Sequence, residues 1–116
     1  MSLTDRIAQG LESGWNVTDS ALLTQNLTAE ADVVVIGTGA GGGTTAEILA
    51  RSGLSVILVE EGRLYYQKDF KMDEQTSYAN LYQEGMSRVT RDGAIAILQG
   101  RCVGGSTTVN WTSSFR

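Results

Sequence analysis

The stretch DVVVIGTGAGGGTTAEILARSG, residues 32–53, decides the fold of this 116-residue chain. It begins with a short apolar run of β-branched side chains, which is typical of a parallel strand buried on both faces. A glycine turn and a helix over residues 44–53 follow, and SVILVEEG, residues 55–62, is a second apolar strand. This order predicts an α/β fold, namely a Rossmann-like βαβ unit. The helix is expected to bury a face made of Ala46, Leu49 and Ala50 and to stop at Gly53.

Three glycines of the turn have the spacing G-x-G-x-x-G. Gly37 permits the tight turn out of the strand, Gly39 lets the backbone approach a pyrophosphate, and Gly42 lets the helix pack closely on the sheet. The amino terminus of the helix offers N–H groups and a partial positive charge to phosphates. The turn therefore predicts a dinucleotide site, whose candidate residues are Gly37, Thr38, Gly39, Ala40, Gly41 and Gly42.

An acidic residue stands at the end of the second strand. Glu60 follows Gly42 by eighteen residues, and its carboxylate can accept hydrogen bonds from both ribose hydroxyls of an adenosine. A phosphorylated ribose is disfavoured because two like charges would meet there. Glu61 should point the other way by strand alternation, so it is the weaker candidate. This motif does not choose between NAD and FAD.

A second glycine-rich stretch, GRCVGGSTTVN, covers residues 100–110. Gly104 and Gly105, followed by three hydroxyl side chains, predict a tight turn with exposed amides that suits phosphates or a flavin edge. Arg101 can face the charge of a pyrophosphate, and Asn110 carries the donor and acceptor needed to read a heteroaromatic ring. From chemistry alone, a surface loop with a glycine bulge remains the alternative.

Residues 31–116 resemble a known enzyme family. VIGTGAGGGTTAEILARSGLSVILVEEG and GRCVGGSTTVNWTSSFR are similar to the two amino-terminal signatures of the glucose–methanol–choline oxidoreductases, most of all their long-chain alcohol oxidase and choline-dehydrogenase-like branches. The resemblance implies an FAD-dependent enzyme that oxidises an alcohol to a carbonyl by hydride transfer to flavin N5, with Glu60 and the first motif on the ADP half. It further implies Arg101, Gly104, Gly105 and Ser106 along the pyrophosphate, and Asn110, Trp111 and Thr112 near the flavin ring.

The same resemblance implies what this chain lacks. Some members of the family tether the flavin through a histidine just before the motif's asparagine, and because Val109 stands there, we expect non-covalent FAD. The family's catalytic base is a histidine of its carboxy-terminal part, and this sequence contains no histidine, so we expect no catalytic residue here. We therefore expect a complementing chain or segment with the rest of the FAD domain, the substrate domain and that histidine, and a small-molecule alcohol as substrate.

The rest of the sequence predicts supporting elements. We expect an amino-terminal helix over residues 2–15, which together with a polar arm forms a first segment, 1–30, ahead of the FAD-binding part, 31–116. A further helix is expected over residues 73–84, and two short strands within residues 87–98 around the turn Arg91-Asp92-Gly93. The tyrosines should be half-buried packing residues; they are Tyr65, Tyr66, Tyr78 and Tyr82.

Composition narrows the function classes. The net charge is −4 without a basic run, so no nucleic-acid partner is expected, and no apolar run approaches the ~20 residues of a membrane span. The single cysteine, Cys102, is expected to be a filler rather than a redox centre, and no metal site is expected. We expect a cytoplasmic location, with peripheral association with the inner membrane left open. Two alternatives stay open, an NAD-linked Rossmann dehydrogenase and a stand-alone nucleotide-binding module without catalysis.

Overall fold

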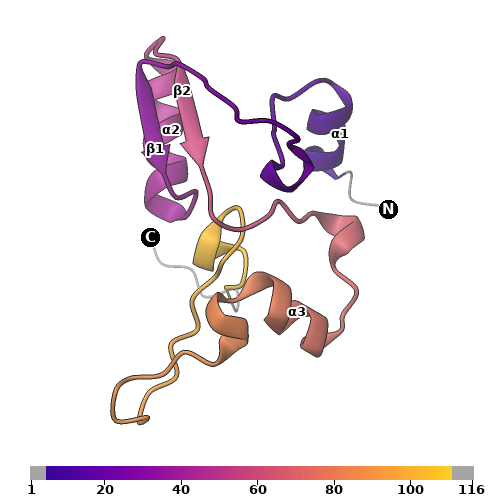
Figure 1. The fold of residues 1–116 in the computed structure, drawn as a ribbon, viewed down its shortest axis with the longest axis vertical. Coiled ribbons are helices and arrows are strands. Elements are labelled where there is room, and N and C mark those ends of the chain that lie inside the picture. The colour runs from indigo at the N-terminus through magenta and orange to yellow at the C-terminus, as the bar shows by residue number, and fades with distance from the viewer. Residues whose placement is uncertain (1–4, 111–116) are drawn as a thin grey trace.

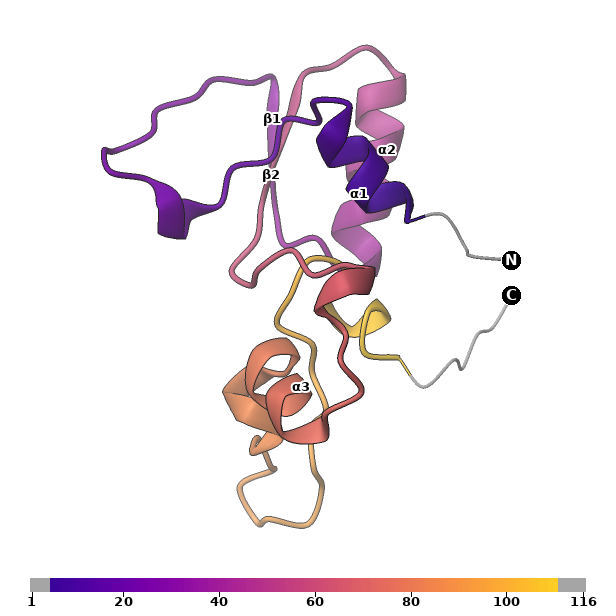
Figure 2. The ribbon, with the colours of Figure 1, turned by 90° about the vertical axis from the view of Figure 1, so that its right-hand side faces the viewer.

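The computed structural model describes residues 5–110, and its central unit is a two-stranded parallel sheet with one helix (Figure 1). The strands β1 (Val33–Ile36) and β2 (Val56–Val59) pair along their whole length. The helix α2 (Ala40–Arg51) connects them and covers one face of the sheet (Figure 2). The predicted Rossmann-like βαβ unit is therefore confirmed.

The turn between β1 and α2 depends on two of the predicted glycines. Gly37 has a φ of +90°, which an L side chain rarely adopts. A Cβ atom on Gly42 would overlap the carbonyl oxygen of Gly37, so the helix approaches the strand at a distance that only glycine allows. Both mechanical roles expected from the sequence are confirmed.

The end of α2 is a Schellman motif. Gly53 has a φ of +92°, its N–H donates to the carbonyl of Ala50 (3.0 Å), and the N–H of Leu54 donates to that of Leu49 (3.3 Å). The predicted stop is confirmed. On the inner face, Ala46 is buried and Leu49 half-buried, but Ala50 is exposed. The prediction for Ala50 was wrong, because a sheet of two strands is too narrow to cover the whole helix face.

The sheet face opposite α2 is open. Val34 is 55% and Ile36 87% exposed, so the prediction that β1 is buried on both faces was wrong for the described residues. Residues 5–110 supply one helical layer and no second layer for this sheet. The chain exposes 9522 Å², against about 6,100 Å² for a compact protein of this mass. Its apolar faces therefore need a cover that the described residues do not provide.

The amino-terminal helix α1 (Arg6–Glu12) is shorter than the predicted 2–15, whose first residues lie outside the described part. Asp5 caps it by accepting two first-turn N–H groups, and its other oxygen accepts the N–H of Gln67 (3.0 Å). The helix ends at Glu12, two residues before Gly14, whose φ is +92°. Its cap residue Asp5 therefore connects it to Gln67, a polar contact that periodicity did not predict.

The α3 region and the loop that follows it lie below the sheet in the view of Figure 1. The helix α3 (Glu74–Leu81) is capped by Asp73, so the start of the predicted helix over 73–84 is confirmed, but the α-helix ends three residues earlier. Residues 87–98 form a hairpin with one antiparallel bridge, between Val89 and Ala96, and not the two strands expected. Pairing stays this short because none of residues 5–110 forms a layer over the hairpin, where Val89 is 52% exposed. Short 3-10 helices occur at Ser20–Leu22 (η1), Gln67–Asp69 (η2), Gln83–Met86 (η3) and Gly105–Thr107 (η4).

All four tyrosines are half-buried, which confirms their predicted packing role. The rings of Tyr78 and Tyr82 meet edge to face, with their centroids 5.7 Å apart. This contact joins the last turn of α3 to the residue that follows it. Tyr78 and Tyr82 therefore stabilise the α3 region through aromatic packing.

The close approach of Gly42 to Gly37 can be tested by substitution in the full-length protein. We expect Gly42→Ala to destabilise it by about 1–3 kcal/mol or more, because its methyl group would overlap backbone. Gly41→Ala, one residue earlier on the same helix, meets nothing within 4 Å and should change stability by less than about 1 kcal/mol. Thermal unfolding midpoints measure both, and equal effects would contradict this account.

Candidate functional site

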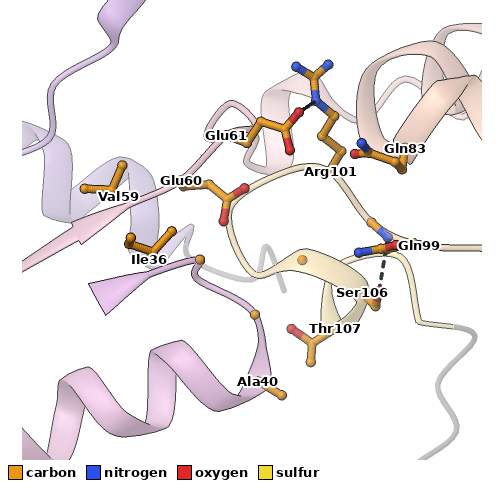
Figure 3. A pocket seen from close by; sticks show the side chains of 14 residues that line it. Ile36, Ala40, Val59, Glu60, Glu61, Gln83, Gln99, Arg101, Ser106 and Thr107 are labelled. Atoms are coloured by element: carbon orange, nitrogen blue, oxygen red, sulfur yellow. Dashed lines mark hydrogen bonds and ion pairs between the residues drawn. The ribbon is translucent and has the colours of Figure 1, made fainter. Parts of the chain in front are cut away.

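A cavity of about 590 Å³ lies at the carboxyl ends of β1 and β2 (Figure 3). This is the edge at which open α/β sheets bind ligands, and the volume is within the range of about 300–1,000 Å³ for small-molecule sites. Both glycine-rich stretches reach it, although they are more than fifty residues apart in sequence. The lining residues are Ile36, Gly37, Gly39, Ala40, Val59, Glu60, Glu61, Gln83, Gln99, Gly100, Arg101, Gly105, Ser106 and Thr107.

The amino terminus of α2 forms one wall of the cavity. Its cap residue is Gly39, which makes no side-chain capping bond, and no acidic residue occupies the first turn. A Cβ atom on Gly37 or Gly39 would meet nothing within 4 Å, so a ligand can approach the backbone there. First-turn N–H groups and the positive end of the helix dipole therefore remain for an anion. This wall fits a diphosphate.

Glu60 stands where β2 ends, and the protein holds both of its carboxylate oxygens. Oε2 accepts from the N–H (2.9 Å) and the hydroxyl (2.7 Å) of Thr38, and Oε1 accepts from the N–H of Gly62 (2.9 Å). Burial opposes ionisation, but these hydrogen bonds outweigh it and lower the pKa of Glu60. A carboxylate has about four acceptor positions, and three of them are taken, so about one remains for a ribose hydroxyl.

The second glycine stretch is tied to the body by backbone hydrogen bonds. Gln83 donates to Gln99 (2.8 Å), Arg101 to Leu81 (2.7 Å), and Val103 to the carbonyl of Arg63 (3.0 Å). Beyond them the chain turns into η4 through two glycines with positive φ, Gly104 and Gly105. These attachments build the stretch into the cavity wall, which argues against a surface bulge serving no site.

Arg101 lies at the cavity rim in an ion pair. Its Nε is 2.7 Å from Oε1 of Glu61, and both side chains are about half exposed (48% and 62%). The sequence predicted that Arg101 faces a pyrophosphate, whereas the structure pairs it with the neighbouring acid. Exposed pairs of this kind contribute about 0–1 kcal/mol, so the guanidinium can turn toward a stronger anion at little cost.

Cys102 is fully buried and lies at the centre of the second glycine stretch. Its Sγ approaches the carbonyl oxygen of Gly105 (3.8 Å), and its own carbonyl accepts the N–H of Gly105 (2.7 Å). Burial raises the pKa of the thiol, and the nearby charge of Glu60 adds to this. A buried, protonated thiol is unreactive, so Cys102 is a packing residue. It is also more than the filler expected from the sequence, because it is fully buried.

The structure gathers half of the predicted cofactor residues at the cavity. Those that line it are Gly37, Gly39, Ala40, Glu60, Arg101, Gly105 and Ser106. Thr38, Gly41, Gly42, Gly104 and Asn110 lie behind or beside this lining, and Trp111 and Thr112 lie outside the described residues.

Sequence reasoning missed several lining residues. Ile36 and Val59 end the two strands, a position that the sheet-edge rule could have flagged. Gln83 and Gln99 reach the cavity only through their backbone pairing, for which the sequence carries no signal.

Residues 5–110 offer neither a membrane span nor a metal site. None of their helices is long and apolar enough to cross a membrane. Within the same range, no three His, Cys, Asp or Glu side chains gather in an arrangement that could hold a metal ion. The cavity is thus the principal candidate site of the described chain.

The sequence is similar to known oxidoreductases. Residues 78–116 match the family model described as GMC oxidoreductase. Long-chain-alcohol oxidases FAO1 and FAO4B of Arabidopsis thaliana are 39% and 42% identical over 75% and 73% of the chain. An uncharacterized GMC-type oxidoreductase of Mycobacterium tuberculosis is 42% identical over 74%. The chain spans only 11–14% of the length of these relatives. No solved structure matches it.

The lowered pKa of Glu60 predicts how its contribution to stability depends on pH. A carboxyl group whose pKa is depressed in the folded state stabilises the protein above its ordinary value of 4.5 and loses this contribution as the pH falls through the folded-state pKa. Glu60→Gln should therefore lower the unfolding midpoint at pH 7, and the difference from wild type should shrink in acid below pH 4.5.

Glu47→Gln is the matched control, because Glu47 forms only an exposed pair with Arg51 on α2. It should cost no more than about 0.5 kcal/mol. A Glu60→Gln difference that is the same at pH 7 and at pH 4 would contradict the assigned hydrogen bonds.

Proposed function

Because the chain belongs to the amino-terminal part of the GMC oxidoreductase family, we propose that it forms the ADP-binding part of an FAD-dependent enzyme that oxidises an alcohol to a carbonyl. One observation carries the proposal. The two glycine-rich stretches, separate in sequence, line one cavity beside an uncapped helix amino terminus and a carboxylate. This is the set of groups that an adenosine diphosphate requires.

Each wall of the cavity has a part in this proposal. Glu60 binds the ribose through its remaining acceptor position, and the turn around Gly39 together with the amino terminus of α2 binds the pyrophosphate. Arg101 would break its ion pair with Glu61 and present its positive charge to the pyrophosphate. In the second glycine stretch, Gly104, Gly105 and Ser106 would contact the pyrophosphate. The resemblance to the family assigns Asn110, Trp111 and Thr112 to the flavin ring.

We further propose that residues 31–116 are the first part of an FAD-binding domain and that residues 1–30 are a helix and an arm outside it. The open sheet face supports an FAD-binding domain that continues in further residues, because Val34 and Ile36 need a covering layer. The rest of the FAD domain, the substrate domain and the catalytic base then belong to a further segment. The relatives, which are several times longer, are consistent with such a segment.

The chemistry divides between the cofactor and the protein. When bound, FAD would supply the oxidant, a hydride acceptor at flavin N5, for conversion of the alcohol to a carbonyl. The proton of the alcohol hydroxyl would pass to a base in the rest of the protein. The resemblance implies a histidine for this role, and the 116 residues contain none. The part of this chain is to bind and orient the adenosine and pyrophosphate, which holds the reactive ring at a fixed place.

Two alternatives are weaker. An NAD-linked dehydrogenase accounts for the first glycine motif but gives no task to the second stretch, which lines the same cavity. A stand-alone binding module would need a core, and the buried apolar side chains of the described residues are Ala46, Leu81 and Cys102. Three small or medium side chains do not stabilise an independent domain.

The proposed activity predicts a spectroscopic result. The purified full-length protein should show a flavin absorption spectrum, and an anaerobic long-chain primary alcohol should bleach it while forming the aldehyde. Long-chain alcohols are the first choice because two relatives are named for them. A protein without flavin that reduces NAD with the same alcohol would support the dehydrogenase alternative instead.

Val109 predicts how the flavin is held. We expect acid precipitation of the yellow protein to release all of its FAD into the supernatant, because valine offers no atom for a covalent bond to the ring. Absorbance of the supernatant and of the redissolved pellet measures the two fractions. Flavin that stays with the washed pellet would overturn this expectation.

A further inference from the structure

The two glycine-rich stretches meet at Thr38. The N–H of Gly104 donates to the hydroxyl oxygen of Thr38 (3.0 Å), across sixty-six residues of sequence. Beside this bond, a Cβ atom on Gly105 would lie 3.1 Å from the Cα atom of Gly39, so the two backbones are in direct contact. The contact joins the wall formed by the turn before α2 to the wall formed by η4.

The hydroxyl of Thr38 has a defined direction. The ionised carboxylate of Glu60 can only accept, so the hydroxyl hydrogen points to Oε2 (2.7 Å). The lone pairs of the same oxygen then accept the N–H of Gly104. The result is a continuous chain of donors, from Gly104 through Thr38 to Glu60, that ends on a negative charge. Hydrogen bonds in such a chain strengthen one another.

We propose that Thr38 is a positioning residue whose hydroxyl joins the second glycine stretch to Glu60, and so holds the two walls of the cofactor cavity in register before the cofactor arrives. The proposal rests on the function proposed above, because it assigns Glu60 to the ribose and the Gly104 turn to the pyrophosphate. Thr38 itself does not line the cavity. It acts through the residues it holds.

The internal bonding of η4 explains why one contact can place the whole turn. The hydroxyl of Thr108 donates to the carbonyl of Val103 (2.8 Å), and that of Thr107 donates to the carbonyl of Gly104 (2.5 Å). The turn therefore moves as a unit. Fixing the N–H of Gly104 fixes the backbone that follows it.

The test compares Thr38→Val with Thr38→Ser in the full-length protein. Valine keeps the shape of threonine and removes the hydroxyl, whereas serine retains it. Thr44→Val on α2 is the matched control, because the Thr44 hydroxyl bonds only within its own helix, to the carbonyl of Ala40. Thr38→Ala is a second variant without the hydroxyl, should the valine variant not fold.

Two readouts are needed. The first is hydrogen exchange of the peptide that contains Gly104, measured by mass spectrometry without FAD. Loss of a bond in a charged chain should speed exchange at this amide about tenfold or more in Thr38→Val, and not in Thr38→Ser or Thr44→Val. The second is the FAD dissociation constant from flavin fluorescence, which should rise about tenfold in Thr38→Val alone.

The outcomes separate this proposal from the function on which it rests. Unchanged exchange at Gly104 in a folded Thr38→Val protein overturns the bridge, even if FAD binds normally. Faster exchange with unchanged FAD affinity overturns the positioning role. A protein that binds no FAD at all refutes the proposed function, while the exchange experiment still decides whether the hydroxyl joins the two walls. Serine behaving like valine also overturns the proposal.

Discussion

The contact on which this structure depends is the approach of α2 to β1 at Gly42 and Gly37. Since no Cβ atom stands between helix and strand, α2 can begin immediately after the turn, with its amino terminus at the carboxyl edge of the sheet. Gly39 is thereby placed where Gly105 touches it. The cavity, its uncapped helix end and its second wall all follow from the missing side chain at Gly42.

Short-range patterns in the sequence were sufficient for the elements of the central unit. The apolar runs gave β1 and β2, the glycine spacing gave the turn, and Gly53 gave the helix stop. These features depend on neighbouring residues, whose preferences the sequence records directly. The identity of Glu60 as the acid at the end of β2 was predictable for the same reason.

What the sequence could not provide is which distant groups meet. Thr38 donates to Glu60 and accepts from Gly104, and these three residues lie in loops far apart in the chain. Whether such loops meet depends on the tertiary arrangement of the helices and strands that they connect. Arg101 paired with Glu61 for the same reason. The predictions for Ala50 and for the outer face of β1 failed because burial depends on neighbouring layers, and the described residues supply only one.

The open face of the sheet has a consequence for synthesis. Both strands also keep one unpaired edge within the described part of the chain. Any covering residues that follow this segment in the chain would leave the ribosome after it, at about 5–20 residues per second. For that period the exposed Ile36 and the bare strand edges offer a template for pairing with other nascent chains. Rapid arrival of the covering layer, or a chaperone that shields this surface, is then a requirement for a good yield of the folded protein.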